Sequence, residues 1–92
     1  MEKSIIKEVA PNIYDWEIRA SRYRILLSTF QCKTLVTWLH KDMIGGSSFL
    51  IQTPEVGIGY FMEKMSMSDA REKDAISILD FLVHMKIIEE YY

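Results

Sequence analysis

The sequence predicts a mainly α-helical domain with a small β-sheet, an α+β protein with three main helices and two short strands. Apolar residues recur at helical spacing over three stretches. These stretches are residues 12–30, 32–43 and 68–85. β-Branched and aromatic residues gather in two short runs, 49–53 and 87–91, which favours extended chain. Because 92 residues suffice for one hydrophobic core, residues 1–92 are expected to form a single domain.

The first two helices are predicted from their apolar spacing. The stripe of the first comprises Ile13, Trp16, Ala20, Tyr23, Leu27 and Phe30. Asn12 can cap its start, and Gln31 is the expected joint to the second helix. The second stripe comprises Cys32, Val36, Leu39 and Met43. The run Gly45-Gly46-Ser47-Ser48 should end the second helix, since glycine and serine have low helix propensity.

The third helix, over 68–85, has the clearest pattern. Ala75, Leu79 and Leu82 recur at i, i+4 and i+7 and define a buried face. Asp69 and Glu72 have capping-box spacing at its start. The residues expected on the solvent face are Lys73, Ser77, Asp80 and His84. This pattern predicts one amphipathic helix.

The two strands are expected to pair with each other. Residues 49–53 read as a strand that ends at Pro54, and 87–91 supply the second strand after the last helix. Between Pro54 and the last helix, alternation allows a strand, but a short helix from about Val56 is favoured. The expected order is therefore helix, helix, strand, helical turn, helix, strand.

Composition and charge are those of an ordinary globular protein. The chain is 49% apolar and 26% charged, and its formal net charge of −2 gives no global attraction to nucleic acid or anionic membranes. The half up to Gly46 holds seven basic and five acidic residues, and the rest holds four basic and eight acidic. Cys32 is the single cysteine, which fits a reducing compartment, and a cytoplasmic location is expected.

Two stretches resemble DEP domains. Lys33-Thr34-Leu35-Val36-Thr37-Trp38-Leu39 resembles their second helix, and Arg71-Glu72-Lys73-Asp74-Ala75 resembles the start of their third. Leu79, Leu82 and the pair Ile87-Ile88 continue the second match, and the two together cover about half of the chain. The resemblance implies a winged-helix-like bundle that serves as an interaction module in signalling proteins. Some members associate with anionic membranes or receptor tails.

The sequence departs from that pattern in two places. The stretch 44–68 is longer than the usual link between the second and third helices, and Lys86 stands where a glycine is common. A broader winged-helix fold or an unrelated small helical protein stays open as an alternative.

Basic and methionine side chains are the candidate partner-binding residues. On a helix, Arg19 and Arg22 would share a face at i, i+3 and present two guanidinium groups to a carboxylate or phosphate. The alternative is a solvated face with salt bridges to Asp15 or Glu17. Met65 and Met67 are candidates for exposed apolar contacts. The full candidate set is Arg19, Arg22, Arg24, Lys33, Lys41, Met65 and Met67.

No residue set predicts catalysis or a metal site. His40 and His84 lie far apart without ligands at zinc spacing, and both are expected at the surface or its boundary. Asp80 could orient His84 as a base, but no nucleophile is identifiable. Gly57-Ile58-Gly59 lacks the third glycine of a dinucleotide loop. We expect no enzyme, no catalytic or metal-binding residue and no cofactor.

The expected function is a non-catalytic interaction module that binds a protein partner. Contact with an anionic membrane through the basic first helix is compatible with it, as is a homodimer formed through the C-terminal strand edge. The alternative is a winged-helix DNA-binding transcription regulator from a virus or mobile element. Nucleic acid is disfavoured because the third helix carries Glu72, Asp74 and Asp80.

Overall fold

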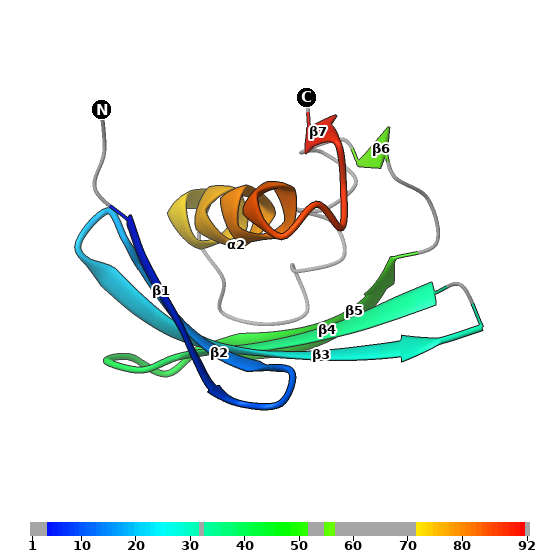
Figure 1. The fold of residues 1–92 in the computed structure, drawn as a ribbon. Helices are drawn as coiled ribbons and strands as arrows, with labels where there is room; N and C mark the ends of the chain where they lie inside the picture. The colour runs from blue at the N-terminus through cyan, green and yellow to red at the C-terminus, as the bar shows by residue number, and fades with distance from the viewer. Residues whose placement is uncertain (1–3, 32, 52–54, 57–71, 92) are drawn as a thin grey trace.

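The computed structural model describes residues 4–31, 33–51, 55–56 and 72–91 of the chain. Five strands form an antiparallel sheet in the order β1-β2-β3-β4-β5, and one helix, α2, lies on one face of it (Figure 1). The sheet strands are β1 (Ser4–Ala10), β2 (Ile13–Ile18), β3 (Ser21–Phe30), β4 (Lys33–His40) and β5 (Gly46–Ile51). The helix is α2 (Glu72–His84), and β6 (Glu55–Val56) pairs in parallel with β7 (Glu90–Tyr91).

The mainly α-helical fold class predicted from the sequence is wrong. Strands β2 and β3 occupy the first predicted helix, and β4 occupies the second. In β3 the buried residues Tyr23 and Ile25 alternate with the less buried Arg22, Arg24 and Leu26, which is the period of a strand. Because both faces of the sheet carry large apolar residues, the sequence satisfies helical spacing as well. A winged-helix bundle of three helices is excluded for the described chain, which contains one helix.

The turn between β2 and β3 carries no conventional turn signal. Arg19 and Ala20 both adopt positive φ, 53° and 60°, which is the backbone of a type I′ hairpin turn. That turn favours Asn-Gly, because a Cβ is strained at positive φ. Without glycine or asparagine there, the hairpin could not be recognised from the sequence. The apolar spacing therefore continues across this turn as it would along a helix.

The predicted strand pairing is also wrong. Residues 49–51 lie in β5 as expected for a strand, but β5 pairs with β4, with Phe49 opposite Val36. In the run 87–91 only Glu90–Tyr91 is strand, and it pairs with β6. Val56 lies in β6, and the rest of the short helix predicted from that residue falls outside the described residues. The C-terminal strand is therefore paired.

The last predicted helix is confirmed over Glu72–His84, while 68–71 lie outside the described residues. The sheet curves around α2, which lies in its hollow (Figure 1). Five helix residues, Ala75, Ile78, Leu79, Phe81 and Leu82, are fully buried. Ser77, expected on the solvent face, is also fully buried. A curved sheet covers more of the helix surface than a flat one, so the solvent face is narrower than predicted.

The core joins α2 to the inner face of the sheet. The ring of Phe81 lies 5.6 Å from that of Tyr14 and 5.6 Å from that of Trp16. Trp16 Nε1 donates a hydrogen bond to the carbonyl oxygen of Ser77 at 3.0 Å. The buried strand residues are Trp16, Ile18, Tyr23, Ile25, Val36, Trp38, Phe49 and Ile51, and Ile88 joins them after the helix.

A matched pair of leucine substitutions tests this packing. Leu79→Ala should lower the free energy of unfolding by about 2–5 kcal/mol, because it leaves a cavity between α2 and the sheet. Leu35→Ala, on the opposite face of β4, should cost less than about 1 kcal/mol. Urea unfolding followed by circular dichroism measures both values. Equal losses would contradict the assigned faces.

The strained turn gives a second test. Ala20→Gly should raise the free energy of unfolding by about 0.5–1 kcal/mol, because glycine adopts positive φ without a Cβ clash. The control is Ala10→Gly in β1, where the backbone φ is not positive, and it should be destabilising. Thermal unfolding measures the Tm of each variant relative to the wild type. A Tm that shifts in the same direction for both variants would refute the turn geometry.

Candidate interaction surface

The face of the five-stranded sheet turned away from α2, here called the outer face, carries exposed leucines. They are Leu26 (36% exposed), Leu35 (40%), Leu39 (51%) and Leu50 (42%), and they form what we call the leucine patch. Leu35 lies directly opposite Leu50 across β4 and β5, and Leu26 is on the neighbouring β3. Contiguous exposed apolar side chains on a small protein mark an interaction site more often than scattered ones do.

A shallow hollow of about 350 Å³ adjoins the leucine patch. Leu26 and Leu35 form part of its wall, and the loop between β1 and β2 forms another part. Its other lining residues include Pro11, Ile13, Leu27 and Thr37. A hollow bounded by aliphatic groups can accept an apolar side chain from a partner.

The other half of the outer face is charged. Asp15 on β2 accepts hydrogen bonds from Arg24 Nε at 2.9 Å and from Lys41 Nζ at 3.2 Å. The hydrogen bond from Arg24, followed by that from Lys41, lowers the pKa of Asp15 below its usual value, although partial burial opposes the shift. Beside this pair, Arg22 Nε donates to Asp42 Oδ2 at 3.0 Å. Its hydrogen bonds to Asp42 lower the pKa of that carboxyl as well.

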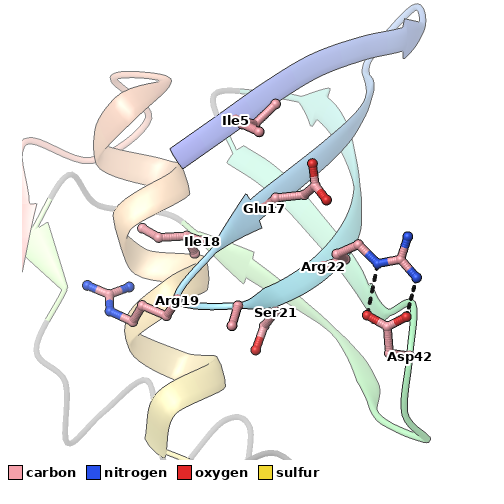
Figure 2. Close-up of a pocket in the computed structure, with 8 residues that line it drawn as sticks. Ile5, Glu17, Ile18, Arg19, Ser21, Arg22 and Asp42 are labelled. Carbon is pink, nitrogen blue, oxygen red and sulfur yellow. Dashed lines mark hydrogen bonds and ion pairs between the residues drawn. The ribbon is translucent and has the colours of Figure 1, made fainter. Parts of the chain in front are cut away.

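A second hollow, of about 290 Å³, lies at the turn between β2 and β3. Figure 2 shows Arg22 pointing to Asp42 on one side of this hollow and Arg19 pointing away from them. Arg19 Nη2 lies 2.5 Å from Asp80 Oδ2 on α2. The two arginines therefore do not share the helix face predicted for them, because strand and turn geometry separates them.

The remaining predicted binding residues have distinct outcomes. Arg24 and Lys41 come together on Asp15, and Lys33 lies opposite Phe30 at the end of the outer face. Met65 and Met67, like Cys32, lie outside the described residues. The leucine patch was missed in the sequence, although the alternation along β4 was a signal for it. Leu35, Thr37 and Leu39 alternate there with the more buried Val36, Trp38 and His40.

A buried polar cluster lies between the sheet and α2. Tyr23 Oη donates to Asp74 Oδ1 at 2.7 Å, and the two rings of Tyr23 and His40 are 4.9 Å apart. Burial, and next the hydrogen bond to Asp74, raises the pKa of Tyr23. His40 is buried, so its predicted place at the surface or its boundary is wrong.

Both ring nitrogens of His40 face polar groups of the protein. His40 Nδ1 accepts a hydrogen bond from the amide of Asp42 at 3.2 Å. Nε2 faces Asp74 Oδ1 at 4.0 Å. Tyr23, His40 and Asp74 are all buried. The cluster ties β3 and β4 to α2.

The candidate pair Asp80–His84, metal sites and membrane-spanning helices can be compared with the described chain. Asp80, proposed above as the partner of His84, binds Arg19, and the ring of His84 lies 5.8 Å from that of Trp16. Among the described residues, no group of three or more His, Cys, Asp or Glu side chains is placed to hold a metal ion. The same residues contain no helix with the length and hydropathy needed to cross a bilayer.

The described residues define a class: a five-stranded antiparallel meander with α2 on its inner face and an exposed outer face. Comparison with family models, curated proteins and solved structures finds no match for the chain. The resemblance to DEP domains is therefore wrong. The buried residues among those that match are Val36, Trp38, Ala75, Leu79, Leu82 and Ile88, and such residues fill a sheet-and-helix core as well as a helical one.

The Asp15 network generates a pH prediction. Because the folded pKa of Asp15 is lowered, its contribution to stability is present above the usual aspartate pKa of about 4 and disappears as pH falls through the folded value. The stability difference between the wild type and Asp15→Asn should therefore shrink on acidification. Urea unfolding between about pH 7 and pH 2 measures it. The control is Glu89→Gln, which also removes one carboxylate charge but at an exposed position. An equal pH dependence for both variants would contradict the stabilisation of ionised Asp15 by Arg24 and Lys41.

Proposed function

We propose that this domain is a non-catalytic protein-binding module whose partner docks on the outer face of the sheet. The main support for this proposal is the leucine patch, in which Leu35 lies opposite Leu50 and about two fifths of each residue is exposed. Burial of apolar surface drives most protein association, and here that surface lies on a rigid sheet. The hollow beside Leu26 provides a place for an apolar anchor of the partner.

The charges around the patch favour an acidic partner surface. On this side of the sheet the described chain carries five cations and three acids. The cations are Lys7, Arg22, Arg24, Lys33 and Lys41, and the acids are Asp15, Glu17 and Asp42. The whole chain has a formal net charge of −2, so the outer face has the opposite sign to the molecule. Complementary charge raises the association rate and orients the partner.

A protein suits this surface better than nucleic acid or a membrane does. The described outer face has an excess of only two cations, which is small for binding a phosphate backbone, and its exposed leucines offer apolar contacts that phosphate cannot use. The basic first helix that was expected to contact a membrane does not form, because β2 and β3 occupy its residues. The single cysteine supports a cytoplasmic setting for the interaction.

Charge insertion into the patch tests the proposal. Leu35→Glu should weaken partner binding by about tenfold or more, because it places a charge in the apolar contact and repels an acidic rim. Ile5→Glu is the matched control, since Ile5 is equally a solvent-exposed apolar residue but lies on β1 at the charged end. Both variants should retain the circular dichroism spectrum of the wild type.

The binding measurement has two stages. Proteins from the source cells that are retained by immobilised wild type and by Ile5→Glu, but lost from Leu35→Glu, are identified by mass spectrometry. Isothermal titration calorimetry with the purified partner then gives the ratio of the affinities of the wild type and Leu35→Glu. It also measures the expected decrease of the wild-type affinity with rising salt concentration. Retention of the same proteins by Leu35→Glu would reject the leucine patch as the docking surface.

A further inference from the structure

The two edge strands of the sheet differ in their protection against further pairing. β1 carries Lys7 and Glu8, and its pairing with β2 is interrupted between Glu8 and Ala10. Charges and irregularities of this kind discourage the addition of another strand. β5, with the sequence GSSFLI, has neither a charged residue nor a proline over its six residues. Among the described strands, β5 is therefore the edge strand without such protection.

The hydrogen-bond pattern identifies the backbone groups of β5 that do not bond to β4. The amide of His40 donates to the carbonyl of Gly45 at 2.9 Å, which sets the alternation along the β4–β5 ladder. Ser47, Phe49 and Ile51 therefore bond to β4, whereas the amide and carbonyl groups of the intervening residues point away from it. Those residues are Gly46, Ser48 and Leu50. In the part of the chain that the structure describes, the five-stranded sheet ends at β5.

We propose that β5 pairs antiparallel with β5 of a second copy of this chain, about a two-fold axis at Ser48. Pairing about Ser48 places Gly46 opposite Leu50 of the other copy and uses all three outward-facing residues. This register forms about six backbone hydrogen bonds and keeps the two outer faces on the same side. The result is one continuous ten-stranded sheet with a helix on each half.

Side-chain contacts favour a second copy as the occupant of this edge. A Cβ placed on Gly46 would lie 2.8 Å from Leu39 Cδ2, so the Leu39 side chain covers that glycine. Leu50 of the second copy, opposite Gly46, therefore meets Leu39 and continues the leucine patch across the axis. Neither β5 strand carries a charge, so the symmetric pairing brings no like charges together.

The dimer does not rest on the proposed partner binding, because it requires only this chain. Sedimentation equilibrium between about 10 µM and about 1 mM should show the mass rising from that of the 10.8 kDa chain toward twice that value. The dissociation constant should change little between about 50 mM and about 500 mM NaCl, since the edge is uncharged. A mass that stays at one chain throughout overturns the proposal.

Ser48→Pro is the specific variant, because proline removes an amide hydrogen that points away from β4. It should weaken the dimer by about tenfold or more. The control Ser48→Ala loses the same hydroxyl contact to Thr37 but keeps the amide, and it should dimerise like the wild type. A dimer that survives Ser48→Pro, in a chain with an unchanged circular dichroism spectrum, overturns the proposal.

Hydrogen exchange and a second variant test the dimer independently of Ser48→Pro, in case that substitution disturbs folding. The amides of Gly46, Ser48 and Leu50 should gain protection as concentration rises, while those of Ser47 and Phe49 stay constant. Leu50→Lys should weaken the dimer, because it brings a charge against Leu39 of the other copy. Protection that does not depend on concentration at the three outward amides overturns the proposal.

Discussion

The packing of α2 into the hollow of the curved sheet is the interaction on which the rest of the structure depends. A five-stranded sheet with one helix needs that helix to cover its apolar inner face, since burial there is the main source of stability. Phe81 contacts the aromatic rings of β2, and polar contacts also hold the helix in place, among them Trp16 to Ser77, Tyr23 to Asp74 and Arg19 to Asp80. These contacts also fix which face of the sheet is left for other molecules.

The outer face follows from that arrangement. Side chains alternate along each strand, so every residue that reaches α2 has neighbours that point the other way. On β3 and β4 those neighbours include Arg24, Leu26 and Leu35, and the outer face is divided into a charged half and an apolar half. In the charged half, Arg24 pairs with Asp15 and Arg22 pairs with Asp42, whereas the leucines of the apolar half are exposed. Binding is therefore assigned to the leucines rather than to the arginines.

Part of the structure could be predicted from the sequence. The helix over Glu72–His84 was predictable because its apolar spacing extends over more than three turns and contains no competing strand alternation. The strand character of 49–51 was predictable from its apolar run bounded by a glycine-rich turn. The strands β2, β3 and β4 were not, because apolar residues on both faces imitate helical spacing and the Arg19-Ala20 turn lacks glycine.

By itself, the sequence determined the near-neutral charge, the amphipathic helix over Glu72–His84 and the strand character of 49–51. The tertiary structure alone decided the strand order, the burial of His40 and Ser77, and the separation of Arg19 from Arg22. These features depend on contacts between residues far apart in the chain, such as Tyr23 with Asp74. Local periodicity reports which side of an element is apolar, but only packing decides what covers that side.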